Sequence, residues 1–182
     1  MASQTTSSST SNRGMELESD INKSNTYYLH NKLAVIHKKP TPIQIVKVDY
    51  PKRTAAKITE AYFRQASTTD YNGIYRGRYI DFEAKESKNK TAFPLKLVHP
   101  HQIAHLKEIL FHGGIGFFIV RWTSLSETYL VPAEKMIHFY QITTRSSIPY
   151  SWFVENGHLI SGNYLNPVHY LEIVDSLYFK ER

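Results

Sequence analysis

A short segment of the chain, YIDFEAK at residues 79–85, alternates apolar and polar side chains. In a β-strand such alternation sends successive side chains to opposite faces, so Asp81, Glu83 and Lys85 share one face. Asp70 lies earlier in the chain, across a predicted turn that would bring its carboxyl group beside that of Glu83. The pattern therefore predicts that acids and an amine converge on one spot.

Two converging carboxylates repel each other unless a hard cation binds between them. Mg²⁺ is commonly held by one or two carboxylates, with water and phosphate oxygens in its remaining positions. Lys85 would orient a water molecule and neutralise charge that develops on a phosphate. This combination is typical of a metal-dependent phosphodiesterase, although a Glu-x-Lys pair on a solvated strand face is the commoner arrangement.

The basic residues are concentrated in one third of the chain. The net charge is +6, from 22 Lys and Arg against 16 Asp and Glu. Residues 32–90 hold thirteen of the basic and six of the acidic residues, a local charge of +7, which leaves −1 for the rest. Such a segment, with tyrosines and prolines interleaved, favours a polyanion such as nucleic acid, and a solvated basic surface is the alternative.

The length and composition exclude several classes of protein. With 182 residues, a mass of 21.1 kDa and 41% hydrophobic residues, the chain fits one globular domain with an appendage. The absence of cysteine excludes disulfides, Cys-ligated zinc and thiol nucleophiles, and it fits a reducing setting. No apolar run approaches the roughly 18 residues of a membrane span, and no signal peptide is recognisable, so we expect a soluble cytoplasmic protein.

The first half of the chain is predicted to contain a helix followed by strands. Residues 1–12 are rich in Ser and Thr and are expected to form a disordered tail. The spacing of apolar residues predicts a helix over residues 14–30. Further runs predict strands over residues 33–36, 43–48, 57–63 and 74–85, with a stiff basic loop at residues 38–42 and a turn at residues 71–73.

The second half is predicted to be mixed α/β. Residues 100–111 place apolar side chains on one helical face and are followed by two glycines, so a helix is expected there. The apolar run at residues 115–122 predicts a strand that is buried on both faces. Residues 128–131 and 167–179 predict a further strand and helix, while residues 141–166 show no clear pattern.

The chain resembles the RecU family of Holliday-junction resolvases in four stretches: AVIHKKPTPIQIVKVDYPKR, ITEAYF, STTDYNGIYRGRYIDFEAKESKNKT and HQIAHLKEI. The match runs from about residue 13 to residue 118, with a weaker echo at residues 164–179. The resemblance implies a restriction-endonuclease-like α/β fold, with a mixed central sheet flanked by helices, in a single nuclease domain over residues 13–182. It also implies a homodimer that nicks four-way junctions symmetrically with Mg²⁺ or, alternatively, Mn²⁺.

The resemblance also assigns roles to individual residues. It implies that Asp70 and Glu83 are metal carboxylates, that Thr68 and Gln102 are further metal ligands, and that Lys85 stabilises the transition state. Without the family, Thr68 is a strand threonine beside Asp70, and Gln102 is an amide at the start of a helix.

In this family a protruding β-hairpin stalk projects from the nuclease core toward the centre of the junction, and residues 35–64 match it. The candidate DNA contacts on the stalk are basic or aromatic: Lys38, Lys39, Lys52, Arg53, Tyr62 and Phe63. For the two aromatic side chains, packing within the strand pair is the alternative, so the basic residues are the stronger candidates.

Four other residues admit a structural explanation as well as a functional one. Asp81 shares the face of Glu83 and is expected to support the metal ligands. Glu18 would reach the metal site from the first helix, or simply favour the start of that helix. His101 and His105 have a spacing that can bind zinc, but solvated helix histidines are commoner.

These observations predict a structure-specific endonuclease that resolves four-way (Holliday) DNA junctions in recombination and repair by metal-dependent hydrolysis. The expected partners are junction DNA and a second copy of the chain, with strand-exchange or branch-migration proteins as further candidates. Two alternatives remain: a branched-DNA-binding protein whose cleavage is weak or secondary, and an enzyme of the same fold that cuts linear duplex at a sequence.

Overall fold

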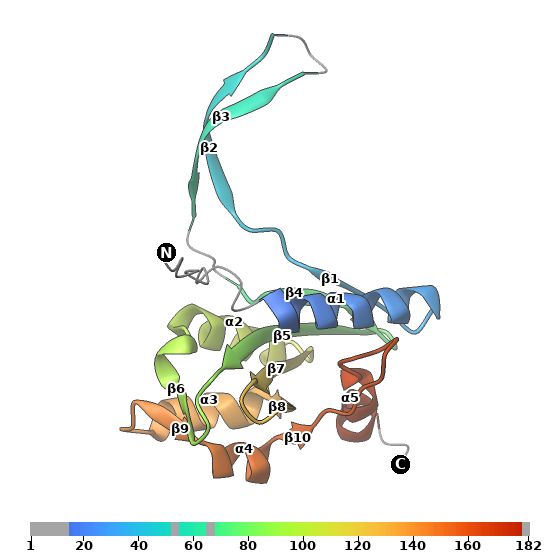
Figure 1. The fold of residues 1–182 in the computed structure, drawn as a ribbon, viewed down its shortest axis with the longest axis vertical. Helices are drawn as coiled ribbons and strands as arrows, with labels where there is room; N and C mark the ends of the chain where they lie inside the picture. Colours follow the sequence, from blue (N-terminus) through green and yellow to red (C-terminus); the bar gives the residue numbers. More distant parts are fainter. Residues whose placement is uncertain (1–14, 52–54, 65–67, 180–182) are drawn as a thin grey trace, which may run out of the picture.

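The computed structural model describes residues 15–51, 55–64 and 68–179, and Figure 1 shows how their helices and strands are arranged. In chain order the elements are α1 (Met15–His30), β1 (Ala34–Lys38), β2 (Ile43–Asp49), β3 (Lys57–Phe63), β4 (Tyr71–Tyr75), β5 (Arg78–Ser87), β6 (Ala92–Pro94), the 3₁₀ turn η2 (Leu95–Leu97), α2 (Pro100–Phe111), β7 (Ile115–Trp122), β8 (Glu127–Pro132), α3 (Ala133–Ile142), β9 (Ser147–Pro149), α4 (Tyr150–Asn156), β10 (His158–Leu159) and α5 (Tyr170–Tyr178).

A six-stranded sheet in the order β1-β4-β5-β7-β8-β10 forms the centre of the body. β5 and β7 run parallel, whereas the other neighbours are antiparallel, so the sheet is mixed. Nearly every residue of β7 is buried, because apolar layers cover both faces of the sheet at this strand. The predicted buried strand at residues 115–122 is therefore confirmed, and so is the mixed α/β architecture.

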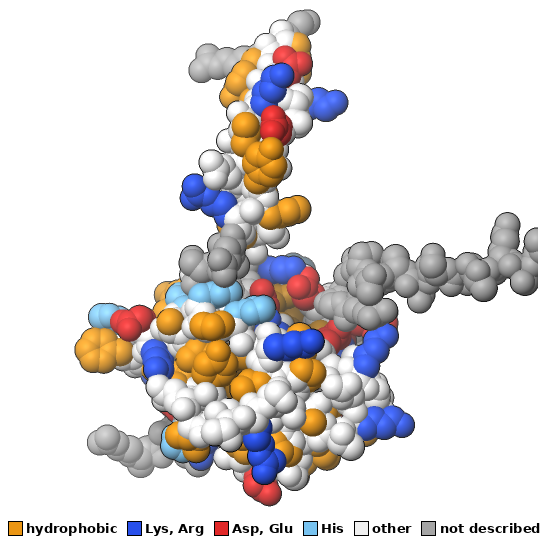
Figure 2. Space-filling model, turned by 90° about the vertical axis from the view of Figure 1, so that its left-hand side faces the viewer, with side chains coloured by type: hydrophobic (Ala, Val, Ile, Leu, Met, Phe, Trp, Pro, Cys, Tyr) orange, Lys and Arg blue, Asp and Glu red, His pale blue; other side chains and the backbone are white. Residues whose placement is uncertain are grey.

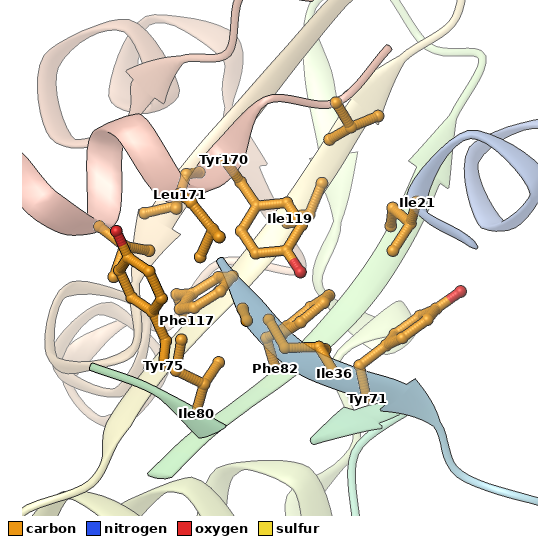
Figure 3. Packing of buried hydrophobic residues seen from close by; sticks show 14 of the residues in the cluster. Ile21, Ile36, Tyr71, Tyr75, Ile80, Phe82, Phe117, Ile119, Tyr170 and Leu171 are labelled. Carbon is orange, nitrogen blue, oxygen red and sulfur yellow. The ribbon is translucent and has the colours of Figure 1, made fainter. Parts of the chain in front are cut away.

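Helices cover the two faces of the sheet. On one face, α1 and α5 pack over Ile80 and Phe82 of β5. On the other, α2 and α3 pack against β7 around Phe118. The rings of Tyr71, Phe82 and Phe117 stack in a row with centroid separations of 4.8 and 4.7 Å (Figure 3). Because this stack fixes one side of β5, the side chains on its other side are directed toward α2.

A two-stranded hairpin formed by β2 and β3 projects far from the body (Figure 1). The pairing begins at Ile43 and Phe63, next to the body, and nearly all side chains of both strands are exposed. In Figure 2, apolar and charged side chains alternate along this projection. The expected protruding hairpin is confirmed. We call it the stalk, and its root is the segment Lys38–Pro42 that leaves the body after β1.

The structure corrects several predicted elements. The strand expected at residues 74–85 is two strands, β4 and β5, and the turn lies at Arg76 and Gly77 instead of residues 71–73. Both turn residues have positive φ, 48° and 76°, which suits a tight hairpin. The helix α3 was not predicted from the sequence, and the stretch without a clear pattern contains β9, α4 and β10. The last helix begins at Tyr170, three residues after the predicted start.

Two further expectations concern the disordered tail and membrane-spanning segments. The tail predicted at residues 1–12 lies outside the described residues. Within the described ranges, no helix has both the length and the apolar character needed to cross a membrane.

Candidate active site

The polar face of β5 carries the predicted acids and the amine. Asp81 and Glu83 are 0% and 1% exposed, and the side chain of Lys85 is mostly buried. Their neighbours Ile80 and Phe82 point into the opposite apolar layer. The predicted alternation along this strand is therefore confirmed, but the polar face is buried instead of solvated.

Asp70 lies beside Glu83 because of the register between β4 and β5. Tyr71 pairs with Phe82, so the next step along the hairpin sets Asp70 opposite Glu83. A carboxylate oxygen of Asp70, Oδ2, accepts a hydrogen bond from the backbone N–H of Ala84 at 3.3 Å. The predicted convergence of the two carboxyl groups is confirmed, although the turn that produces it lies several residues further along the chain.

Burial raises the pKa of the Glu83 carboxyl from 4.5 to about 8. Lys85 opposes this shift through an ion pair of 2.6 Å between Nζ and Oε1 of Glu83, and the nearby negative charge of Asp70 adds to it. The second oxygen of Glu83, Oε2, is buried and has no hydrogen-bond partner among the described residues. Glu83 is thus a carboxyl group whose charge is only partly compensated by the protein.

A buried carboxylate oxygen without a partner, next to a second carboxylate, is the donor set that a hard divalent cation fits. Cation binding would replace the proton that burial favours on Glu83 and would relieve the repulsion from Asp70. Within the described residues, no three His, Asp or Glu side chains are grouped so that they could hold a metal. The two carboxylates would therefore need neutral oxygen ligands to complete a site.

Thr68 and Gln102, the two neutral candidates, are both engaged locally. Thr68 Oγ1 donates to the carbonyl oxygen of Thr69 at 3.4 Å. Gln102 is buried in the first turn of α2, where its Oε1 accepts from the backbone N–H of His99 at 3.0 Å as part of a capping box. An amide oxygen has two lone pairs, so this bond leaves Gln102 one further acceptor position.

Asp81 is the centre of a buried polar cluster that the sequence did not predict. Its Oδ2 is 2.8 Å from Lys39 Nζ, 3.0 Å from the donating hydroxyl of Tyr79 and 3.1 Å from His105 Nε2. Its Oδ1 accepts a short hydrogen bond from the hydroxyl of Thr69. We call these five residues the Asp81 cluster. The alternation of β5 predicted which face Asp81 would occupy, and Tyr79 shares that face, but the other three partners come from distant segments and were not predicted.

Histidines of α2 and its N-cap lie close to this face. The rings of His99 and His101 stack with a centroid separation of 5.5 Å, and a patch of histidine side chains is visible near the foot of the stalk in Figure 2. Burial lowers the pKa of His101, and the positive charges of His99, Lys85 and His105 contribute to the shift. Among the described residues His101 and His105 do not belong to any three-residue metal-binding group, and His105 contacts Asp81 instead.

The predicted DNA-binding residues of the stalk lie in different surroundings. Lys38 pairs with Glu18 of α1 at the surface, whereas Lys39 points into the body toward Asp81. Phe63 is 83% exposed at the foot of β3. Lys52 and Arg53 lie outside the described residues.

A cleft of about 620 Å³ lies between the stalk root and Asp70. Its walls include the acidic Glu18 and Asp70, the basic Lys38, Lys39 and Arg64, and the neutral Thr68. Glu18 faces this cleft but pairs with Lys38. The cleft therefore connects the stalk root with one of the two acids of the site.

Comparisons with known proteins agree on one family. The family model described as Recombination protein U, RecU, matches residues 12–176. Proteins named Holliday junction resolvase RecU are similar over most of the chain. The one from Geobacillus kaustophilus is 58% identical over 92% of this chain and 86% of its own length, and the one from Leuconostoc mesenteroides is 59% identical over 91% and 81%.

Solved structures are similar to this chain as well, and one of them comes from an archaeon. This structure is that of Archaeoglobus fulgidus Hjc, described as a Holliday junction resolvase from an archaeal hyperthermophile. The match covers 79% of this chain and 93% of the Hjc chain, with 10% sequence identity and a TM-score of 0.47. The family match and the close relatives cover nearly the whole sequence, including both carboxylates, Lys85 and the stalk. This chain therefore belongs to the RecU family.

Proposed function

We propose that the chain is a structure-specific endonuclease that resolves four-way DNA junctions by metal-dependent hydrolysis of phosphodiester bonds, in recombination and repair. The observation that carries the proposal is the buried Glu83, whose partly compensated charge adjoins Asp70 and Lys85 at the foot of a protruding stalk. The relatives that match nearly the full chain are named Holliday junction resolvases, which supports the junction as the substrate.

Asp70 and Glu83 are the carboxylates that would hold the metal, which we propose to be Mg²⁺, with Mn²⁺ as the alternative. Thr68 and Gln102 would add neutral oxygens. When bound, the cation supplies Lewis-acid activation of water and of the scissile phosphate. Lys85 holds its ammonium group 2.6 Å from Glu83, so it keeps the carboxylate oriented and adds positive charge where the phosphate develops negative charge.

The stalk is proposed to recognise the branch point. Its exposed strands carry lysines and aromatic side chains, and Phe63 offers a ring on which an unpaired base can stack. Lys38 stands at the mouth of the cleft, and its ion pair with Glu18 is partly exposed, so a phosphate can compete for it. Lys52 and Arg53 stay candidate contacts from the sequence alone.

A four-way junction has two equivalent strands to cut, so we propose that two copies of the chain act together as a homodimer. Strand-exchange and branch-migration proteins remain predicted partners. The single nuclease domain over residues 13–182, with residues 35–64 as the stalk, is kept as a prediction. The cytoplasm is the location we propose, because the absence of cysteine fits a reducing setting.

The proposal is tested by a cleavage assay with Mg²⁺ on a synthetic four-way junction and on linear duplexes built from the same arms. We expect paired nicks in the junction only, and we expect Glu83→Ala and Lys85→Ala to abolish them while junction binding is retained. Lys107→Ala, on the exposed face of α2, is the control that should cut like the parent.

Three results would contradict the proposal or part of it. If the junction is bound but is not cut with any divalent metal, the chain is a branched-DNA-binding protein. If linear duplex is cut as well as the junction, the enzyme does not recognise the branch. A Glu83→Ala variant that cuts at the parental rate would remove Glu83 from the reaction.

A further inference from the structure

The carboxylate of Asp81 is completely buried and is contacted from three other parts of the chain and by one residue of its own strand. Lys39 comes from the stalk root, Thr69 from the segment before β4, Tyr79 from the start of β5 and His105 from α2. A buried carboxylate must be paired and hydrogen-bonded, because an isolated charge in the interior is costly. The nearest full positive charge, 2.8 Å away, is the ammonium group of Lys39.

Lys39 is also bonded to the segment that carries Asp70. Its backbone N–H donates to the carbonyl oxygen of Asp70 at 2.7 Å, and its Nζ is 3.0 Å from the hydroxyl of Thr69. The same hydroxyl donates to Asp81. Three contacts therefore connect the stalk root, the residue next to Asp70 and the strand that carries Glu83.

We propose that Lys39 and Asp81 form an anchor that joins the stalk root to the metal-site carboxylates, so that the two are positioning residues for junction cleavage. The inference rests on the proposed nuclease function. In this arrangement Lys39 does not contact DNA. It holds Asp70 at a fixed place relative to Glu83 and relative to the stalk that binds the junction. Asp81 supplies the buried charge that keeps the Lys39 side chain turned inward.

The neighbouring lysine provides the contrast. The side chain of Lys38 is 39% exposed and its partner Glu18 is similarly exposed, whereas the Lys39 side chain is 17% exposed and its partner is not exposed at all. An exposed ion pair gives way easily to a phosphate, but removing Lys39 from its place would leave Asp81 buried without its cation. The two lysines, adjacent in sequence, are thus expected to act differently.

The first test is the salt dependence of junction binding for Lys38→Met and Lys39→Met, measured in EDTA so that nothing is cut. Each phosphate contact contributes about one unit to the slope of log K against log salt concentration. We expect Lys38→Met to lower the slope by about one unit and Lys39→Met to leave it unchanged. A slope that falls by about one unit in Lys39→Met would make Lys39 a DNA contact and overturn the anchor.

The second test is the single-turnover cleavage rate at saturating junction. We expect Lys39→Met and Asp81→Asn each to lower it about 10- to 100-fold, since small displacements of reacting groups have effects of this size. Because both belong to one anchor, the double variant should cut no more slowly than the slower single variant. Rates that remain parental, or losses that multiply in the double variant, would contradict the proposal.

The third test does not depend on catalysis, so it separates the anchor from the proposed function. Hydrogen exchange of the metal-free, DNA-free protein reports on the N–H of Lys39, which is bonded to Asp70. In Lys39→Met and Asp81→Asn we expect this amide to lose protection at least 10-fold, while the amides of β7 keep theirs. Unchanged protection at the stalk root would refute the anchor even if the parent resolves junctions. A parent that cuts no junction, with the exchange result as expected, would refute only the nuclease function.

Discussion

Metal-free protein should lose stability as the pH rises from 4.5 to about 8, because Glu83 has to ionise in a buried place. The pKa of Glu83 is about 8 in the folded state, against 4.5 when unperturbed. Between these values the folded chain holds a proton that the unfolded chain has released. Since the native state then binds more protons than the unfolded state, the free energy of unfolding falls with rising pH in this window.

The size of the effect follows from the difference between the two pKa values, 8 − 4.5 = 3.5. At about 1.36 kcal/mol per unit, the full loss above pH 8 is about 5 kcal/mol, and local relaxation or water entry would reduce it to ~2–5 kcal/mol. Glu83→Gln has the same shape and cannot ionise. The variant should therefore match the parent at about pH 4, below the unperturbed pKa of Glu83, and exceed its stability by ~2–5 kcal/mol at about pH 8.5.

The assay is urea denaturation in EDTA at several pH values, followed by comparison of parent and variant. The comparison cancels the contribution of His101, whose lowered pKa makes stability rise with pH through its own titration. Asp70→Asn is a second variant. In Asp70→Asn the free energy of unfolding should fall less with rising pH than in the parent, because the charge of Asp70 raises the pKa of Glu83. Equal pH dependence in the parent and in Glu83→Gln would refute the reasoning.

Two further substitutions test the stalk and its support. Phe63→Ala should change the free energy of unfolding by less than about 0.5 kcal/mol, because the ring is exposed. If a base stacks on the ring, the same substitution should weaken junction binding by about 1–3 kcal/mol. Equal junction affinity of variant and parent in a binding titration would exclude the ring as a contact. Gly73→Ala should destabilise by about 1–3 kcal/mol or more in urea denaturation, since an added Cβ would lie 2.1 Å from the carbonyl oxygen of Val35 on β1. Unchanged stability would mean that β1 can move away without loss.

The strand of the candidate active site, β5, was predictable because alternation is a local property. YIDFEAK specifies which side chains share a face, and pairing with the preceding strand then brings Asp70 to Glu83. The turn was misplaced because Asn72 and Gly73 form a typical turn signal. In the structure Gly73 lies in β4, where its missing side chain allows β1 to come close, and the chain reverses at Arg76 and Gly77.

The partners of the buried charges were not predictable from the sequence pattern. The sequence around Lys39 is basic and rich in proline, which is typical of a DNA-binding loop. Only the tertiary fold turns this lysine toward a carboxylate 42 positions away in the chain. His105 has the spacing of a zinc ligand or of a solvated helix residue, yet it contacts Asp81. The helix α3 begins at Ala133, directly after β8 ends at Pro132, so no connecting loop separates the two elements; Pro132 and the acidic Glu134 in the first turn are the helix-start signals that could have identified it.

Asp81 and Glu83 lie two residues apart on the same face of one strand, and both are buried, but the fold gives them opposite surroundings. Four donors or cations surround Asp81, three of them from other segments of the chain, so its charge is matched within the protein. Glu83 has one ammonium partner, an acidic neighbour and one oxygen with no partner among the described residues. A bound cation adds little stabilisation to a carboxylate whose charge is already matched by the protein. The same cation stabilises strongly a carboxylate that would otherwise hold a proton near neutral pH. The difference in compensation, and not the residue type or the burial, is therefore what makes Glu83 suited to bind a cation and Asp81 suited to hold the stalk.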